Sequence, residues 1–446
     1  MADRSLSEAS VDYDDAPLRP FHLRVALASS GGVFSDGYGL GIIGISLSLA
    51  AHELALTPIW MGLLGGASLL GLFVGALLTG PAADRFGRRA IFAYNMALLA
   101  GLSLMQGLTD SRPLLLSLRL AIGFLLGTDY VVGKALLSEF TPRRFRGRIL
   151  GSLSVAWAGG YACAYFVGFA LSDSGPQAWR WMLLTSAAPC LLVLPLRIML
   201  PESPLWLTSH GRAAAAAAVV RDKLGTGVSP PVKAHAAPAT QGRWRQLFSP
   251  AWRLRTLVGC AFFTCQVIPY FAVGTFVSQV MAAMNLRSGY VGGLFYNASL
   301  LGGAILGLTI VDRISRRHFL IGSFCIAAAA MLALSLWSSV PAIAMSILFA
   351  LFAGVLSAAS NLCYVYLPEL FTTDLRASGI GVAIAASRIG SAVSTFLLPI
   401  VVADFGVRTA LGACVTVLAL GAVICLRWAP ETKHIRLGAF DRPSTG

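Results

Sequence analysis

The chain has 446 residues, of which 56% are hydrophobic and only 12% are charged. Soluble domains carry about 25% charged residues, so this composition excludes an ordinary water-soluble protein. The net charge is +14, but most of the Lys and Arg residues fall in loops on one side of the predicted membrane. This positive-inside bias predicts that both termini are cytoplasmic, and it removes the main reason to expect a nucleic-acid partner.

Apolar runs near 20 residues recur along nearly the whole chain, and each is long enough to cross a hydrocarbon core of roughly 30 Å. Because the bilayer offers no water to the polar groups of the backbone, such runs must be helical. We therefore predict an all-α integral membrane protein with twelve transmembrane helices. The predicted spans are residues 23–50, 58–79, 90–109, 114–138, 149–171, 179–200, 255–280, 290–311, 318–338, 341–367, 379–402 and 408–428.

The spans form two sets of six, separated by a polar stretch. The predicted order is a cytoplasmic N-terminal tail (1–22), a six-helix bundle (23–200), a cytoplasmic inter-bundle segment (201–253), a second six-helix bundle (254–428) and a cytoplasmic C-terminal tail (429–446). The inter-bundle segment contains the run Ala213–Ala218, which predicts a short helix, and is expected to tie the two bundles together. The first twenty residues are acidic and lack the apolar core of a signal peptide.

Two landmarks recur at nearly the same distance along the chain. The polar stretch Gly80–Arg89 returns in degraded form as Gly307–Arg317, and Glu139 with Arg146 returns as Glu369 with Arg376. Asp84 and Asp312 are 228 residues apart, and Glu139 and Glu369 are 230 residues apart. A shared period at two independent places predicts a duplicated half, and therefore two pseudo-symmetric bundles.

The cysteines and histidines give no sign of a metal site or of a disulfide framework. All eight Cys fall inside or at the edges of apolar spans, without a Cys-x-x-Cys pair or an accompanying His cluster. No set of nucleophile, base and metal ligands converges in the sequence, so we expect no enzyme and no cofactor. Gly39-x-Gly41-x-x-Gly44 matches a dinucleotide fingerprint, but it lies inside a span without a preceding strand.

Several short motifs follow one another along the loops and spans. They are GPAADRFGRR (80–89), Arg119-x-x-x-Gly123-x-x-x-Gly127, Ser138-Glu139-Phe140 to Arg146-Gly147, PESPLWL (201–207), DRISRR (312–317), PELFTTDLRASGIG (368–381) and PETK (430–433). By these motifs and their order the chain resembles the major facilitator superfamily. Within that superfamily it is similar to the sugar-porter and metabolite:proton symporter branches. The resemblance covers nearly the whole chain.

The resemblance implies a secondary active transporter in the inner membrane that works by alternating access. The expected partners are a small polar or anionic organic metabolite, protons and the lipid bilayer, with the protein as a monomer. Proton symport is the leading interpretation. A proton-coupled exporter and a non-transporting nutrient sensor with the same fold are the alternatives.

Departures from the sugar-porter pattern favour an anionic solute over a simple sugar. Sugar porters carry paired Gln in the seventh span, where this chain has Gln266 alone, and Gly-Tyr-Asp in the first span, where it has Gly37-Tyr38-Gly39. The stretch Gly127-x-Asp129-Tyr130 is similar to anion:proton symporters, and Arg388 is similar to aromatic-acid symporters.

Five charged residues are predicted in the interior of the spans, away from the span ends: Asp36, Arg119, Asp129, Lys134 and Arg388. Each costs about 2.5–3.5 kcal/mol at the bilayer centre, so they imply a wet cavity or mutual pairing. We assign proton coupling to Asp36, Arg119 and Asp129, and the resemblance supports an ion pair between Asp36 and Arg119. A static pair is the alternative for Asp36, and a partnership with Lys134 is the alternative for Asp129. Lys134 itself could instead reach toward Glu139.

Substrate contacts are expected from polar and aromatic residues in the middle of both halves, because transporters bind where their repeats meet. The predicted substrate residues are Tyr38, Tyr130, Lys134, Gln266, Tyr270, Asn361, Tyr364 and Arg388, followed by Ser154, Trp157 and Asn297. The predicted cytoplasmic gate comprises Asp84, Arg85, Arg88, Arg89, Glu139, Arg146, Asp312, Arg313, Glu369 and Arg376. A solvated charge cluster that only sets membrane topology is the alternative for the gate.

Overall fold

Among the residues that the computed structural model describes, twelve helices are long and apolar enough to cross a membrane, as predicted. The structure describes residues 11–231, 243–284, 289–311, 313–337, 341–371 and 373–432. The helices of the first half are α1 (Pro20–Glu53), α2 (Pro58–Phe86), α3 (Arg88–Gly107), α4 (Arg112–Phe140), α5 (Arg143–Leu171), α6 (Ala178–Thr185) and α7 (Ala187–Ile198). Those of the second half are α10 (Arg253–Thr275), α11 (Val277–Ala283), α12 (Gly289–Ile310), α13 (Arg316–Leu336), α14 (Ala342–Ser360), α15 (Leu362–Glu369), α16 (Thr373–Phe405) and α17 (Val407–Trp428).

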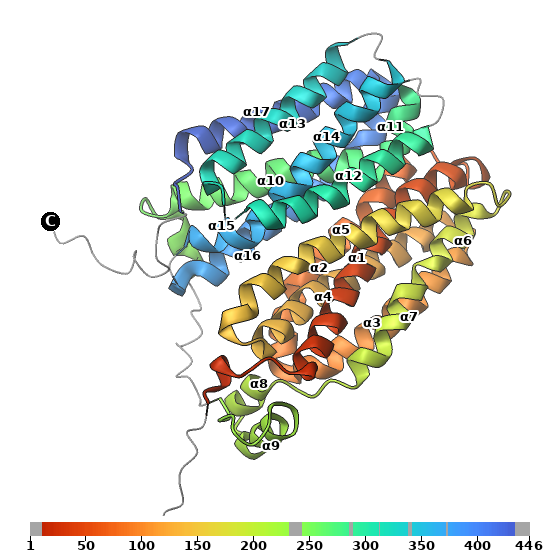
Figure 1. Cartoon of the computed structure of the whole chain (residues 1–446). Helices are drawn as coiled ribbons and strands as arrows, with labels where there is room; N and C mark the ends of the chain where they lie inside the picture. Colours follow the sequence, from red (N-terminus) through yellow and green to blue (C-terminus); the bar gives the residue numbers. More distant parts are fainter. Residues whose placement is uncertain are drawn as a thin grey trace, which may run out of the picture.

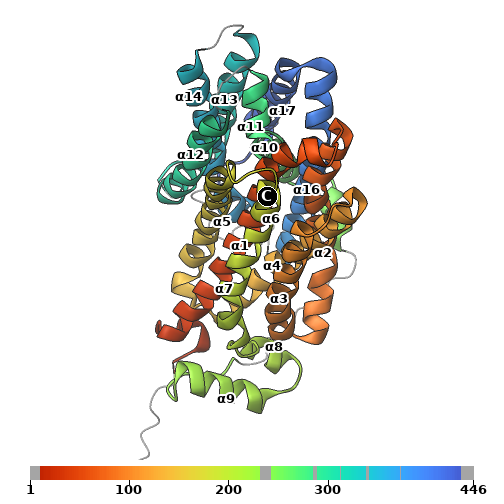
Figure 2. The ribbon, with the colours of Figure 1, turned by 90° about the vertical axis from the view of Figure 1, so that its right-hand side faces the viewer.

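The two halves pack their helices in the same pattern. In the first half α1 packs on α5, α2 on α4, and α3 on α7; the equivalent pairs in the second half are α10 with α16, α12 with α14, and α13 with α17. Between the halves α2 packs on α16 and α5 on α12. Figures 1 and 2 show the halves as two neighbouring bundles, red to yellow-green and green to blue. This arrangement is the pseudo-symmetric pair of six-span bundles that the sequence repeat predicts.

Several helices begin where the sequence carries a start signal. Thr57 accepts a hydrogen bond from the Trp60 backbone N–H and is followed by Pro58, and Ser111 does the same for Leu114. A side-chain oxygen before the first turn satisfies one of the free N–H groups there, and proline is tolerated at that place. These signals therefore fix the starts of α2 and α4.

Helices α2, α5 and α16 extend further than predicted into the charged motifs. Asp84 and Arg85 form the last turn of α2, and Arg88 and Arg89 form the first turn of α3. The stretch between the predicted spans 58–79 and 90–109 is therefore helical except at Gly87. Gly87 alone separates the two helices, with a φ of 94° that favours glycine because it carries no Cβ.

Small residues bring the helices together, as expected for packing in lipid. An added Cβ on Gly75 of α2 would overlap the carbonyl oxygen of Phe124 in α4, and one on Gly62 would overlap that of Phe396 in α16. The first contact holds a bundle together and the second joins the two bundles. Substitutions at these glycines would separate backbones that now touch.

The segment after the first bundle stays attached to that bundle. It contains α8 (Pro204–Ser209) and α9 (Ala213–Leu224), which confirms the predicted short helix, and both lie beyond the end of the first bundle in Figure 1. Trp206 donates its indole N–H to the Asp84 carbonyl at 2.9 Å. A 3-10 turn, η2 (Arg243–Phe248), packs on α10 and α16 of the second bundle. Residues 232–242 lie outside the described residues, so the predicted tie between the bundles is described only at its two ends.

Candidate substrate and coupling site

A cluster of two cations and two tyrosines lies where the bundles meet. Lys134 of α4 places its Nζ 3.2 Å from the ring centroid of Tyr130, one turn earlier on the same helix, and 4.6 Å from that of Tyr364 of α15. The Arg388 guanidinium of α16 lies 5.6 Å from the Tyr130 centroid. The structure thus brings four of the predicted substrate residues together, two from each half.

Neither cation of this cluster is neutralised by the protein. Within the described ranges, no carboxylate lies at ion-pair distance from Lys134 or Arg388, and the Nε of Arg388 has no hydrogen-bond partner. Arg388 is only 7% exposed. Instead its guanidinium lies 6.0 Å from the ring of Phe263 and 5.8 Å from that of Phe271, both on α10. Cation–π contacts reduce the cost of such burial but do not remove the charge.

Asp129 has a partner that our sequence analysis did not identify. Arg197 of α7 binds both carboxylate oxygens, with Nη2 2.9 Å from Oδ2 and Nη1 in direct contact with Oδ1. Asn95 also donates to this carboxylate, at 3.4 Å. Arg197 donates to the Phe92 carbonyl at 3.1 Å and lies against the ring of Phe92. The proposed partnership of Asp129 with Lys134 is therefore wrong.

Two sequence features bear on this ion pair, the position of Arg197 and the glycine at position 32, and neither was enough to predict it. Arg197 lies near the end of its span, where we counted it with the loop charges, yet its side chain reaches back into the bundle. Its partner is 68 residues away in the sequence. Gly32 of α1 leaves the necessary room, because a Cβ there would overlap the Arg197 guanidinium. Gly32 was the only local sequence feature that indicated a close contact at this place.

The predicted ion pair between Asp36 and Arg119 is not formed in this structure. Arg119 donates from Nη1 to the Gly39 carbonyl at 3.2 Å. Asp36 is 3% exposed, and its Oδ1 has no hydrogen-bond partner among the described residues. Asp36 and Gly39 are three residues apart on α1, or about 4.5 Å along the helix axis. Arg119 thus contacts the next turn of α1, and pairing with Asp36 requires a shift of α1 against α4 or a new side-chain rotamer.

The other predicted substrate residues lie around the cation cluster or point away from it. Tyr270 lies 6.0 Å from the ring of Trp157, and Phe271 lies 5.8 Å from that ring, which joins these aromatic residues to Arg388. Asn361 accepts a hydrogen bond from Ser154 across the bundle interface at 2.7 Å.

Three of the predicted substrate residues make their hydrogen bonds within their own bundle. Tyr38 donates to Thr185 inside the first bundle at 2.8 Å, and Gln266 donates to the Leu356 carbonyl at 3.0 Å. Asn297 is fully buried and donates to the Gly293 carbonyl of its own helix. Phe263 and Phe271 are the residues at the cluster that sequence reasoning missed, since phenylalanines in an apolar span carry no polar signal.

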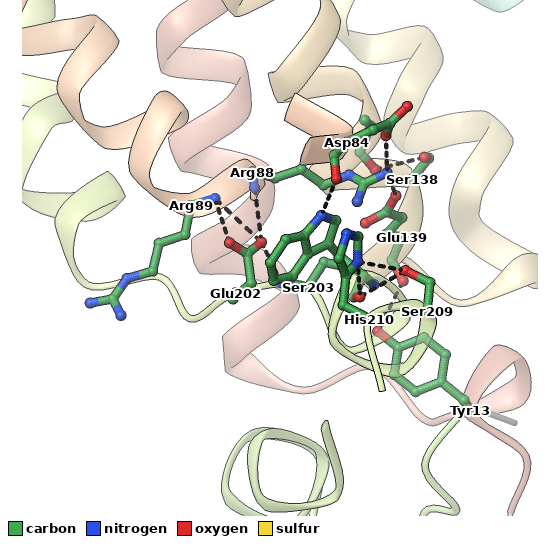
Figure 3. Close-up of polar contacts among 12 residues, drawn as sticks. Tyr13, Asp84, Arg88, Arg89, Ser138, Glu139, Glu202, Ser203, Ser209 and His210 are labelled. Atoms are coloured by element: carbon green, nitrogen blue, oxygen red, sulfur yellow. Dashed lines mark hydrogen bonds and ion pairs between the residues drawn. The ribbon is translucent and has the colours of Figure 1, made fainter. Parts of the chain in front are cut away.

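Charged residues form equivalent networks in the two bundles, at the end that we call the charged end (residues 84–89, 139–146 and 313–317). The networks contain predicted gate residues and also Arg316, which was not predicted. In the first bundle Arg88 binds Glu139 at 3.0 Å and Asp84 at 3.2 Å (Figure 3). In the second bundle Arg316 lies 3.8 Å from Glu369. Arg88 and Arg316 occupy the same place in the repeat, so the duplication extends to side-chain contacts.

A second acidic residue completes each network. Glu202 accepts hydrogen bonds from the backbone N–H groups of Arg88 and Arg89 at 3.1 Å each, at the start of α3 (Figure 3). Glu431 accepts from the Arg316 and Arg317 N–H groups at 3.2 Å each, at the start of α13. A carboxylate at a helix start satisfies free donors and interacts favourably with the helix dipole. The repeated Pro-Glu-Ser and Pro-Glu-Thr motifs were the available signal.

The remaining gate predictions have different outcomes. Arg146 binds Asp14 of the N-terminal segment at 2.9 Å, and not Glu139. Tyr13 next to it donates to the Glu139 carbonyl at 3.0 Å, and burial raises the pKa of this hydroxyl, which keeps it protonated. The side chains of Arg85, Arg89 and Arg313 are exposed. Asp312 and the side chain of Arg376 lie outside the described residues.

Twelve membrane-crossing helices in two equivalent bundles, with charged side chains of both bundles meeting between them, define a membrane transporter of the major facilitator type. Residues 25–442 match the family model described as sugar (and other) transporter, and the chain belongs to that family. The inner membrane metabolite transport protein YgcS of Escherichia coli (strain K12) is 40% identical over 434 residues, 97% of each chain. The protein of that strain named "Putative metabolite transport protein YaaU" is 34% identical over 433 residues, 96% of this chain and 97% of YaaU.

Solved structures show the same fold. The inward open conformation of the xylose transporter XylE from E. coli matches with a TM-score of 0.78 at 19% identity, over 94% of this chain and 99% of XylE. The protein is therefore a metabolite transporter and not an enzyme, as predicted.

Proposed function

We propose that the protein is a secondary active transporter of a small organic anion, driven by protons and working by alternating access. The observation that carries this proposal is the pair Lys134 and Arg388, a partly buried and a buried cation at the bundle interface with no carboxylate at ion-pair distance among the described residues. A charge inside the membrane costs several kcal/mol unless it is paired or hydrated. A substrate carboxylate would supply the missing negative charge.

The position of the two cations favours a transport role over a static one. Lys134 belongs to the first bundle and Arg388 to the second, and Tyr364 of the second bundle contacts Lys134. An anion held between them would contact both bundles at once, so its binding would favour states in which the bundles are close together. The surrounding rings of Tyr130, Phe263 and Phe271 favour an anion with a flat or apolar body.

Asp36 is the better of the two candidate proton carriers. Asp129 is already bound by Arg197 through both carboxylate oxygens, whereas Oδ1 of Asp36 has no partner in the described part of the chain. A buried carboxylate without a cation favours its protonated form. The proton:xylose symporter XylE shares the fold, which is consistent with proton coupling. Pairing of Asp36 with Arg119 stays a prediction for another state of the transport cycle.

We further propose that the charged end faces the cytoplasm of an inner-membrane protein and takes part in the gate. The positive-inside bias supports this orientation, as does the name of the relative YgcS. The contacts of Arg88 with Glu139 and of Arg316 with Glu369 join residues of one bundle each. They would stiffen the ends of the helices that separate or approach when the transporter changes state.

Purified protein in liposomes tests the proposal. A pool of labelled carboxylates, sugars and amines is offered under an inward proton gradient, an outward gradient and no gradient. We expect accumulation of one or more carboxylates that requires the inward gradient and is lost with a protonophore. Accumulation of neutral sugars alone would contradict the anion assignment. Accumulation that requires the outward gradient would make the protein an exporter.

A further inference from the structure

The two bundles are in close contact in the half of their interface that lies away from the charged end. A Cβ added to Gly44 of α1 would overlap the Thr275 carbonyl oxygen of α10. One added to Gly293 of α12 would overlap the Tyr165 hydroxyl of α5. Both glycines lie nearer to the end of their helix that is opposite the charged end. The bundles are therefore closed against each other on that side of the molecule.

A polar contact accompanies these glycine contacts close to the helix ends. Gln279 of α11 donates a hydrogen bond from Nε2 to Ser48 Oγ of α1 at 3.0 Å, and both side chains are half-buried. Ser48 precedes the last residue of α1 by five positions, or about 7.5 Å along the helix axis. The bond thus joins the first bundle to the second at the end opposite the charged end, where water can replace it.

Ser48 keeps a hydrogen bond when the bundles separate. Its hydroxyl donates to the Gly44 carbonyl of its own helix at 2.9 Å, so loss of Gln279 leaves the hydroxyl paired. The Gln279 amide can then bond to water. Because the net value of such a hydrogen bond is small, the Gln279 bond should favour the closed arrangement by about 2- to 10-fold. A contact of this strength biases the position of the bundles without fixing it.

The same arrangement recurs deeper in the interface. Ser154 Oγ of α5 lies 2.7 Å from Asn361 Oδ1 of the second bundle and 2.8 Å from the Gly151 carbonyl of its own helix. Its single hydroxyl hydrogen can therefore pass from the amide to its own helix. Ser154 lies about 16 Å along α5 from the charged end, and Lys134 lies about 9 Å from the end of α4 there. This bond is thus on the far side of Lys134 from the charged end.

We propose that the Ser48–Gln279 and Ser154–Asn361 bonds are latches that close the path between the substrate cluster and the side opposite the charged end. In each latch a serine of the first bundle, which can bond to its own helix, meets an amide of the second bundle. Opening toward that side breaks both bonds and leaves no serine hydroxyl unpaired. This inference rests on the alternating access of the proposed function, but not on the charge of the substrate or on proton coupling.

Distances between spin labels on purified protein in lipid nanodiscs test the latch formed by Ser48 and Gln279. The labels are placed on Ser174→Cys and Asp404→Cys, exposed positions of the two bundles at the end opposite the charged end. The exposed native cysteine is removed by Cys325→Ser. Ser48 and Gln279 are suited to this test because neither is a predicted substrate or coupling residue.

Each single variant, Ser48→Ala and Gln279→Ala, should raise the population with the long label distance by about 2- to 10-fold. The double variant should match the single ones, because all three lose the same bond. Ser46→Ala is the matched control, since Ser46 donates to the Ile42 carbonyl of α1 at 2.8 Å in the same way. It should leave the distances unchanged.

Labels at the charged end separate a latch from local loosening. On Arg144→Cys and Arg427→Cys they should move closer in the same variants, because one side closes as the other opens. Unchanged distances in the single variants, an equal shift in Ser46→Ala, additive shifts in the double variant or a charged end that does not respond would each overturn the proposal. The measurement uses neither substrate nor a proton gradient, so failure of anion transport would be seen separately.

Discussion

Two arginine sites in the spans differ in how fully the protein itself satisfies their charge. Both terminal nitrogens of Arg197, Nη1 and Nη2, donate to Asp129, and Arg197 also donates to backbone carbonyls of α1 and α3. Arg388 lies at the bundle interface among aromatic rings, with Nε unpartnered and no carboxylate at ion-pair distance among the described residues. The first site is complete without a ligand, and the second is not. The comparison teaches that satisfied buried charges hold a bundle together, whereas unsatisfied ones at an interface are available to a substrate.

Removing one partner of the Asp129–Arg197 pair should have the largest effect on stability. Arg197→Gln leaves Asp129 buried with an uncompensated charge, which we expect to destabilise the protein by about 3–5 kcal/mol. The measurement is the melting temperature of purified protein together with the amount of folded protein in membranes. The double variant Asp129→Asn with Arg197→Gln should recover much of the loss. A single variant as stable as the wild type would show that the pair contributes little to folding.

Removing a cation of the incomplete site should leave folding intact and weaken transport. Arg388→Gln deletes a charge that the protein itself does not neutralise, so its Tm should equal or exceed that of the wild type. Binding of the transported anion should fall by about 30-fold or more, which equals a loss of about 2 kcal/mol. Radioligand binding to purified protein measures this. A large loss of stability with unchanged affinity would assign Arg388 a structural role.

The Asp36→Asn variant should still move substrate across the membrane but should no longer couple that movement to the proton gradient. The amide cannot carry a proton but fits the same space, so exchange of labelled for unlabelled substrate should persist within a few-fold. Accumulation driven by a proton gradient should disappear. Asp129→Asn is the matched control, and it should affect stability more than coupling. Proton-driven accumulation by Asp36→Asn would remove this residue from the coupling mechanism.

A substitution at the charged end should have the smallest effect on stability and transport. Asp84 binds Arg88 at 3.2 Å but is largely exposed, so Asp84→Asn should cost at most about 1 kcal/mol of stability. We expect slower turnover with nearly unchanged substrate affinity, measured as initial rates and binding on one preparation. Weaker binding at an unchanged turnover rate would contradict a role in the gate.

Apolar length and the internal repeat were sufficient to predict the architecture. The spans follow from runs that can cross a bilayer, and the repeat predicted that Glu139 and Glu369 occupy equivalent positions. Their partners in the structure are Arg88, which was predicted for the gate, and Arg316, which was not. Helix ends were less predictable, because Asp84 and Arg88 are polar and still helical. Close contacts between α2 and α4 depend on glycines such as Gly75, because nothing larger fits there.

The candidate site was predicted in its members but not in its pairings. Lys134, Tyr130, Tyr364 and Arg388 were expected from charge and aromatic character inside spans, and the structure brings them together. The partner of Asp129 could not be predicted, because it depends on how α4 and α7 rotate against each other and on how far Arg197 reaches. Tyr38 was misleading for the same reason, since its hydroxyl turns into the first bundle.

The most direct test of the central claim compares a transported acid with its neutral amide. Equilibrium affinities of both compounds are measured for the wild type and for Arg388→Gln by calorimetry on one detergent preparation. If the unneutralised cations hold the substrate's negative charge, the wild type binds the acid far more tightly than the amide, and the variant loses most of that difference. Equal affinity of the wild type for acid and amide would contradict the account.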